Sequence, residues 1–107
     1  MPEKEPFFIP LGLDDELRVR ITTQGPHVTH FTVQQETRID GRMIPVVRYD
    51  TAHGQAHIDV LDGRGRTIQK IDLGFFFPYN QALQWCLTDA KRRWESRKDA
   101  FPKGMDT

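Results

Sequence analysis

Short segments in which apolar and polar residues alternate, separated by turn signals, fill most of the chain between Glu16 and Leu73. In the first segment Leu17, Val19 and Ile21 alternate with polar residues, which places apolar side chains on one strand face and cations on the other. The same reasoning predicts strands at residues 16–22, 28–36, 43–49, 56–61 and 66–73. Because the connections are short, we expect an antiparallel β-meander of about five strands.

After Gly74 the spacing of apolar residues becomes that of a helix. The residues on this stripe are Tyr79, Leu83, Cys86, Leu87, Ala90 and Trp94. The pattern predicts one long C-terminal helix whose stripe, Trp94 included, packs on the sheet. With 107 residues, 37% hydrophobic and 10% aromatic, the chain supports one thin core. The predicted fold class is therefore α+β with two layers.

The two ends of the chain lack such patterns. Residues 1–15 contain three prolines and show no period, which indicates an extended N-terminal arm. Residues 16–101 are predicted to form a single α+β domain, and residues 102–107 are predicted to be a frayed tail. Pro45, within the third predicted strand, indicates that this strand lies at a sheet edge or contains a bulge.

Charge and cysteine content narrow the class of protein. The 15 Lys and Arg balance 15 Asp and Glu, which excludes a uniformly basic nucleic-acid binder and an acidic disordered tail. The cations are nevertheless concentrated in residues 91–103, and acidic residues in the N-terminal arm. A single cysteine, no apolar leader and no apolar run near the roughly 20 residues of a membrane span predict a cytoplasmic protein without membrane insertion.

The densest group of ionisable residues lies in one predicted strand–loop–strand unit. Its members are Arg48, Asp50, His53, His57 and Asp59. Alternation places the first two on one strand face and the last two on one face of the next strand, so antiparallel pairing brings them together. We expect His53 and His57 to act as acid and base, Arg48 to stabilise phosphate charge, and Asp50 or Asp59 to orient a histidine. This would suit metal-independent cleavage of RNA.

Two other interpretations of this hairpin remain open. Arg48 opposite Asp50 or Asp59 is also the pattern of an ordinary cross-strand ion pair, worth about 0.2–1 kcal/mol. Alternatively, His53, His57 and Asp59 are residue types that bind metal ions, although their spacing lacks the helical geometry that makes paired zinc histidines specific. We predict neither a metal nor a cofactor.

A second candidate surface lies on the predicted helix, opposite its apolar stripe. Trp85, Arg92 and Arg93 lie there, and we predict that all three bind substrate. An exposed tryptophan beside cations is suited to stacking on a base and binding phosphate, or to anchoring a protein partner. The alternative is that the N-terminal arm covers Trp85 through Phe7 or Phe8.

The run VVRYDTAHG at residues 46–54, followed by His57 and Asp59, resembles the Arg-Tyr-Asp-Asn-Ala-His segment of small prokaryotic proteins related to TumE-type toxins. The similarity covers residues 29–62 and the general order of a β-meander followed by a terminal helix, with Thr51 where the family usually has Asn. The resemblance implies a toxin component of a toxin–antitoxin module, with a helix-turn-helix antitoxin as partner. It nominates Arg48, Asp50, His53 and His57.

Two functions follow from these observations. The first is the toxin component of a toxin–antitoxin or related defence module that acts on RNA, in its catalytic form as a metal-independent ribonuclease. The alternative is a non-enzymatic interaction module that binds a protein partner through a sheet edge and the Trp85 face of the helix. Open sheet edges also favour a homo-oligomer.

Overall fold

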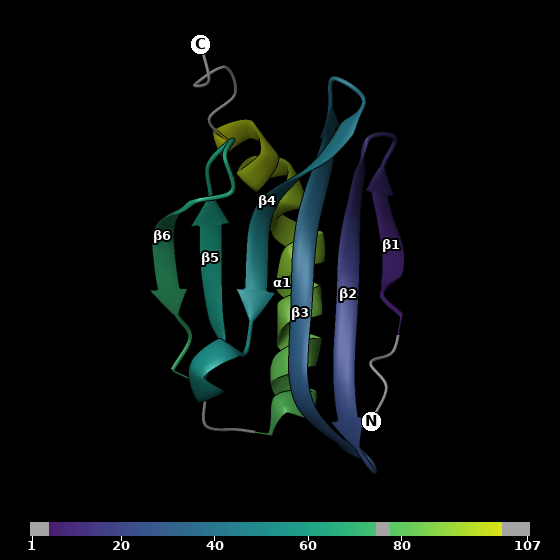
Figure 1. Cartoon of the computed structure of the whole chain (residues 1–107), viewed down its shortest axis with the longest axis vertical. Coiled ribbons are helices and arrows are strands. Elements are labelled where there is room, and N and C mark those ends of the chain that lie inside the picture. Colours follow the sequence, from purple (N-terminus) through teal and green to yellow (C-terminus); the bar gives the residue numbers. More distant parts are fainter. Residues whose placement is uncertain (1–4, 75–77, 102–107) are drawn as a thin grey trace.

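The computed structural model describes residues 5–74 and 78–101, which form one six-stranded antiparallel sheet in chain order followed by a helix (Figure 1). The strands are β1 (Phe7–Gly12), β2 (Asp15–Gln24), β3 (His27–Ile39), β4 (Arg42–Asp50), β5 (His57–Leu61) and β6 (Thr67–Asp72). A short 3-10 helix η1 (Ala52–Gly54) precedes β5, and helix α1 (Tyr79–Ala100) follows β6. The predicted α+β meander with a C-terminal helix is confirmed, with six strands in place of five.

The additional strand is β1, so the prediction of an extended arm is wrong for residues 7–12. This segment pairs antiparallel with β2, from Phe7 opposite Val19 to Gly12 opposite Asp15. It shows no clear alternation in the sequence because a strand at the sheet edge leaves most of its side chains exposed. Pro10 is compatible with this position, since an edge strand does not need every backbone N–H for pairing. Residues 1–4 of the predicted arm and the predicted tail at 102–107 lie outside the described residues.

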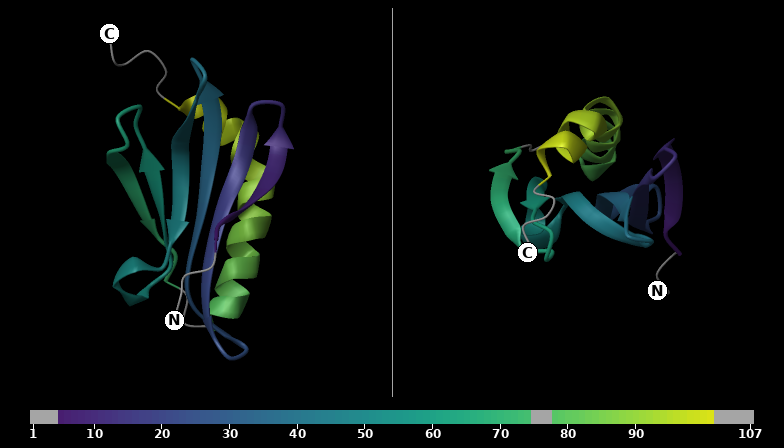
Figure 2. Two further views of the ribbon diagram at one scale, coloured as in Figure 1. Left: turned by 45° about the vertical axis from the view of Figure 1, so that its right-hand side comes forward. Right: turned by 90° about the horizontal axis from the view of Figure 1, so that it is seen from above.

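Helix α1 lies across one face of the sheet, which curves around it (Figure 2). It packs mainly on β3 and β4. The buried apolar residues between the two layers are Leu17, Val19, Phe31, Val33, Val47, Tyr49 and Ile58 from the sheet and Ala82, Leu83, Cys86 and Ala90 from the helix. Trp94 differs from the prediction, because it is only half-buried. Its indole lies beside Gly12 of β1, where an added Cβ would come within 3.1 Å of the ring.

The β3–β4 hairpin confirms one turn signal and decides between the two interpretations of Pro45. Asp40 and Gly41 have φ angles of 52° and 77°, as required by the two-residue turns that match the twist of paired strands. Pro45 lies in β4, which is paired on both sides. The interpretation as an edge strand is therefore wrong. The register of β3 and β4 shifts next to Pro45, and this bulge accommodates the missing N–H.

Helix α1 contributes the buried Cys86 and carries cations in its last turn, where they interact favourably with the helix dipole. Burial raises the pKa of the Cys86 thiol to about 12, so the thiol stays protonated near neutral pH and is not a candidate nucleophile.

Within residues 5–74 and 78–101, no helix combines the length and the apolar character needed to cross a membrane.

Candidate functional site

The sheet face that α1 leaves uncovered carries aligned rows of side chains, and we call it the outer face. Its residues are those that alternate along the strands with the core residues. The strand register places Phe8, Arg18, Gln34, Arg48, Asp59 and Lys70 in one row. A second row contains Arg20, Thr32, Asp50, His57 and Asp72. The structure thus brings the two predicted pairs together, with Arg48 opposite Asp59 and Asp50 opposite His57.

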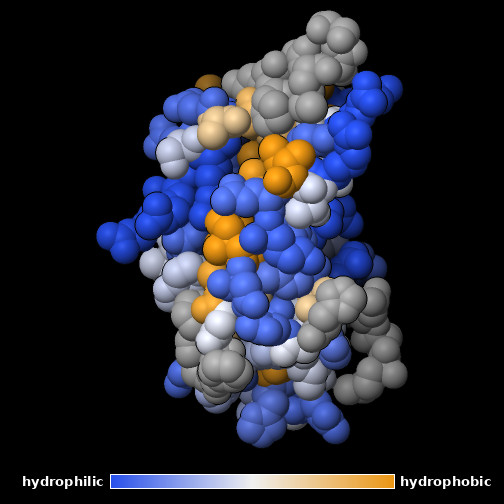
Figure 3. All heavy atoms as spheres, turned by 90° about the vertical axis from the view of Figure 1, so that its left-hand side faces the viewer, coloured by the Kyte–Doolittle hydropathy of each residue, from blue (hydrophilic) through white to orange (hydrophobic). Residues whose placement is uncertain are grey.

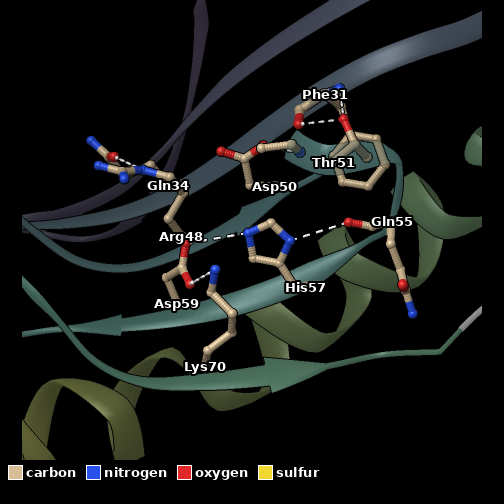
Figure 4. A network of polar contacts seen from close by, with 10 residues as sticks. Phe31, Gln34, Arg48, Asp50, Thr51, Gln55, His57, Asp59 and Lys70 are labelled. Carbon is tan, nitrogen blue, oxygen red and sulfur yellow. Dashed lines mark hydrogen bonds and ion pairs between the residues drawn. The ribbon is translucent and has the colours of Figure 1, made fainter.

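His57 and Asp59 form the buried centre of the outer face (Figure 4). His57 Nε2 lies 3.3 Å from Asp59 Oδ2, and His57 Nδ1 lies 3.1 Å from the carbonyl oxygen of Gln55. Both residues are 7% exposed, because neighbouring strands and side chains enclose them. The two ring nitrogens therefore both face oxygen acceptors, and only the doubly protonated imidazole donates to both.

The second carboxylate oxygen of Asp59 has no hydrogen-bond donor. This atom, Oδ1, is buried and accepts no hydrogen bond from the described residues. The nearest cation, Lys70, approaches it only to 4.0 Å. Because a buried acceptor without a donor is costly, this oxygen is an unfavourable feature of the buried centre.

Arg48 and Asp50 make other contacts than the predicted ion pairs. Arg48 Nε donates to Gln34 Oε1 over 2.9 Å, and Gln34 Nε2 donates in turn to Glu36 Oε2 over 2.6 Å. Asp50 Oδ1 accepts from the backbone N–H of Ala52 over 2.7 Å, at the start of η1. Among the described residues Arg48 forms no ion pair with either aspartate, so the interpretation as a cross-strand ion pair is wrong.

The loop that carries His53 is fixed by Thr51 as well as by Asp50. Thr51 is buried, and its Oγ1 accepts from the backbone N–H of Phe31 over 3.1 Å. The backbone of His53 lies in η1, but its side chain lies outside the described part of the structure. The pairing of His53 with His57 therefore stays a prediction.

Two shallow cavities flank the centre of the outer face. One, of about 170 Å³, is lined by Arg18, Arg20, Thr32 and Gln34. The other, of about 150 Å³, is lined by Ala52, Gln55, His57, Lys70 and Asp72. Among the described residues the first lining combines two guanidinium groups, a hydroxyl and an amide, which is the chemistry of an anion site. The alternation of β2 predicts a cationic face, but only the register with β3 reveals this cavity.

The predicted helix surface is also present. Trp85, Arg92 and Arg93 line a cavity of about 440 Å³ together with Thr88 and Asp89. Trp85 is 40% exposed, so it is not fully covered, and a contact with Phe7 or Phe8 of the N-terminal arm stays a prediction. Trp94 lies beside β1.

Asp89 connects this cavity to the interior. Its carboxylate accepts from Tyr49 Oη over 2.7 Å and from Arg93 Nε over 2.8 Å, and Arg97 Nη2 lies 3.2 Å away. Arg97 also donates to the Tyr49 hydroxyl and lies over its ring, 5.4 Å from the centroid. Burial alone would raise the pKa of Asp89, but the hydrogen bonds from Tyr49 and Arg93 and the charge of Arg97 hold it below its usual value. Burial raises the pKa of Tyr49.

Several cations predicted to be available on α1 are thus already paired. Arg93 and Arg97 bind Asp89, and Lys98 Nζ lies 2.9 Å from Asp15 Oδ2. Asp15 belongs to the acidic part of the predicted arm, so this part does contact the helix. Among the predicted substrate-binding cations of α1, Arg92 is exposed, whereas Arg93 already donates a hydrogen bond to Asp89 through its Nε.

The metal interpretation requires three ligands in one place. Among the residues that the structure describes, no group of three or more His, Cys, Asp and Glu side chains is arranged to hold a metal ion. His57 and Asp59 do lie together, but the third predicted ligand, the His53 side chain, falls outside this part.

The chain was compared with curated proteins, solved structures and models of protein families. No curated protein and no solved structure matches it. The model of one family matches residues 1–107, and that family is described as a domain of unknown function, DUF7718. The chain, with its six-stranded sheet, C-terminal helix and polar outer face, is therefore a member of the DUF7718 family.

Proposed function

We propose that the outer face binds RNA and that the chain is the toxin component of a toxin–antitoxin or related prokaryotic defence module. The observation that carries this proposal is the cavity lined by Arg18, Arg20, Thr32 and Gln34, which brings two guanidinium groups together with hydroxyl and amide hydrogen-bond donors. Guanidinium groups bind phosphate oxygens through pairs of N–H donors. RNA presents such phosphates at regular intervals, and a cytoplasmic location would give the chain access to it.

A third arginine extends the cationic surface towards the centre of the outer face. Arg48 is two strands from Arg18 in the same row, with Gln34 between them, which corresponds to about 10 Å. The Arg48 guanidinium is oriented by its hydrogen bond to Gln34 and is not neutralised by an aspartate. The resemblance of residues 46–54 to TumE-type toxins supports the toxin assignment and a helix-turn-helix antitoxin as partner.

The buried centre provides groups suited to a ribose and to its chemistry. His57 Nε2 and Asp59 Oδ2 lie 3.3 Å apart, and the 2′-hydroxyl that distinguishes RNA from DNA is the group on which this pair would act. In the catalytic form of the proposal, the 2′-oxygen attacks the adjacent phosphorus and gives its proton to one histidine. The 5′-oxygen leaves with a proton from the other, with His53 and His57 in these roles, and His57 takes part by exchanging its Nδ1 contact with the Gln55 carbonyl oxygen for the substrate. Arg48 stabilises the charge that develops on the phosphate, and Asp59 orients His57.

The proposal predicts salt-dependent RNA binding. Three arginine–phosphate contacts correspond to a slope of roughly −2 when the logarithm of affinity is plotted against that of salt concentration. Affinity should therefore fall about 20-fold between about 50 mM and 200 mM salt. Fluorescence anisotropy of a labelled single-stranded RNA measures this dependence. Absence of binding at low salt, or binding that salt does not weaken, contradicts the proposal.

A second candidate function is supported by the cavity at Trp85. An exposed tryptophan flanked by Arg92 is a typical anchor for a protein partner with an acidic surface. The open edge strand β6 adds exposed Ile68 and Ile71, and in Figure 3 apolar residues form a strip on this side of the molecule. In this alternative the chain is an interaction module, and the edge it uses is β6 rather than the strand that contains Pro45.

The interaction module predicts that Trp85→Arg abolishes binding to the proposed helix-turn-helix antitoxin, because a charge replaces the apolar anchor. The two proteins are co-expressed, and the complex is quantified by titration calorimetry. Gln84→Arg is the matched control, since it adds the same charge at the neighbouring exposed helix position. A complex of unchanged affinity with the Trp85 variant contradicts this alternative.

A further inference from the structure

Phe8 is an exposed aromatic ring on the outer face. It belongs to the edge strand β1, lies directly opposite Arg18 in the register, and is 52% exposed. Phe7, its neighbour, points to the opposite side of the sheet, because it pairs with the core residue Val19. The row that begins at Phe8 therefore continues with a guanidinium group, and the cavity of Arg18 and Arg20 lies one strand further in.

An aromatic ring beside phosphate-binding arginines has a specific use in nucleic-acid recognition. Bases of a single strand stack on such rings while neighbouring cations hold the backbone. In a duplex the bases are stacked on one another and their faces are not accessible. We propose that Phe8 is a stacking platform for an unpaired RNA base whose adjacent phosphates are held by Arg18 and Arg20, an inference that rests on the proposed function and restricts its substrate to single-stranded RNA.

The charges around Phe8 determine on which side of the ring the RNA backbone lies. Phe8 also lines a cavity of about 280 Å³ whose charged lining is Asp14, Asp15, Glu16 and Arg38. Among the described residues the three carboxylates outnumber the single guanidinium, which lies 3.9 Å from Asp14 Oδ1. Carboxylates repel phosphates, so this side of Phe8 accommodates a neutral base and not the backbone. The backbone therefore lies on the Arg18 side of the ring and continues towards Arg48.

The test compares Phe8→Ala with Phe7→Ala. Both changes remove an exposed phenyl ring from β1, since Phe7 is 47% exposed, but only the first removes it from the outer face. The probe is a labelled single-stranded RNA, and its affinity is measured by fluorescence anisotropy over a range of salt concentrations. Phe8→Ala should weaken binding roughly tenfold without changing the salt slope, because stacking involves no charge, while Phe7→Ala should leave binding nearly unchanged.

A second probe identifies the base as the group that contacts Phe8. The probes are RNAs of the same length, each with one base missing at a different position. The RNA that lacks the base in contact with Phe8 should bind the wild-type chain more weakly than the others. At that position the losses from Phe8→Ala and from the missing base should not add, as expected for two groups that contact each other. Phe8→Trp should retain binding, because indole also stacks.

The outcomes separate this inference from the proposed function. If the wild-type chain binds RNA but Phe8→Ala and Phe7→Ala behave alike, stacking is overturned and the phosphate contacts stand. If duplex RNA binds as tightly as single-stranded RNA, the restriction to single strands is wrong. If sedimentation shows that Phe8→Ala instead disrupts a dimer, the β1 edge is a protein interface and stacking is again overturned. If the wild-type chain binds no RNA, both proposals fail together.

Discussion

Replacing Asp89 with alanine should lower the free energy of unfolding by about 3 kcal/mol, the usual cost of removing one partner from a buried ion pair. The carboxylate is the common acceptor for Tyr49, Arg93 and Arg97. Without it the Arg97 guanidinium, whose side chain is only 18% exposed, is left beside the Tyr49 ring with no anion to neutralise it. Chemical denaturation measures the loss.

The same residue predicts how stability depends on pH. The pKa of Asp89 is lowered in the folded chain, so the unfolded chain binds more protons in this range. The stabilisation is therefore fully present above the pKa of the unfolded state, near 4, and is lost as pH falls through the folded value. The Asp89→Ala variant should lose less stability than wild type between about pH 5 and pH 3. Glu95→Ala, an exposed change on the same helix, should alter stability by about 0.5 kcal/mol or less and keep the wild-type pH dependence.

RNA cleavage should fall at least about 100-fold when His53 and His57 are both replaced by alanine, because an acid–base pair typically contributes about 10²–10⁴ to the rate. The matched control is His27→Ala with His30→Ala, which removes two exposed histidines from β3. Cleavage is followed on a labelled RNA with the pure protein, and circular dichroism checks that each variant is folded. Equal cleavage by the two double variants, or no cleavage by the wild-type chain, contradicts the catalytic form of the proposal.

The strands and the helix were predictable where one face of an element is buried and the other is not. The alternation around Leu17 and Val19 and the stripe through Leu83 and Cys86 reflect this contrast, and both are confirmed. β1 was missed because it lies at an edge and buries little, so its sequence carries no period. Trp94 was placed in the core from its helical position, whereas its half-buried state depends on β1 beside it.

The candidate site was predictable only in part, because register and side-chain partners depend on tertiary packing. Alternation placed Arg48 and Asp50 on one strand face and His57 and Asp59 on one face of the next strand, and the β4–β5 register confirms that the two sets come together. It did not predict that Arg48 donates to Gln34, because Gln34 comes from another strand. The Asp89 network was missed for a similar reason. Its cations resemble a solvated helix end in the sequence, and Tyr49, which donates to Asp89, lies 40 positions from it in the chain.

The central claim is that the outer face binds RNA through its arginines, and the affinity of Arg18→Ala combined with Arg20→Ala tests it most directly. The control variant combines Arg42→Ala with Arg64→Ala, which removes the same charge from two exposed positions outside the cavity lining, the first residue of β4 and the β5–β6 turn. Both are titrated with the same single-stranded RNA at low salt. The account predicts that the first variant binds at least about tenfold more weakly than wild type and has a shallower salt slope, while the control binds nearly as wild type does. Equal affinities for the two variants would contradict it.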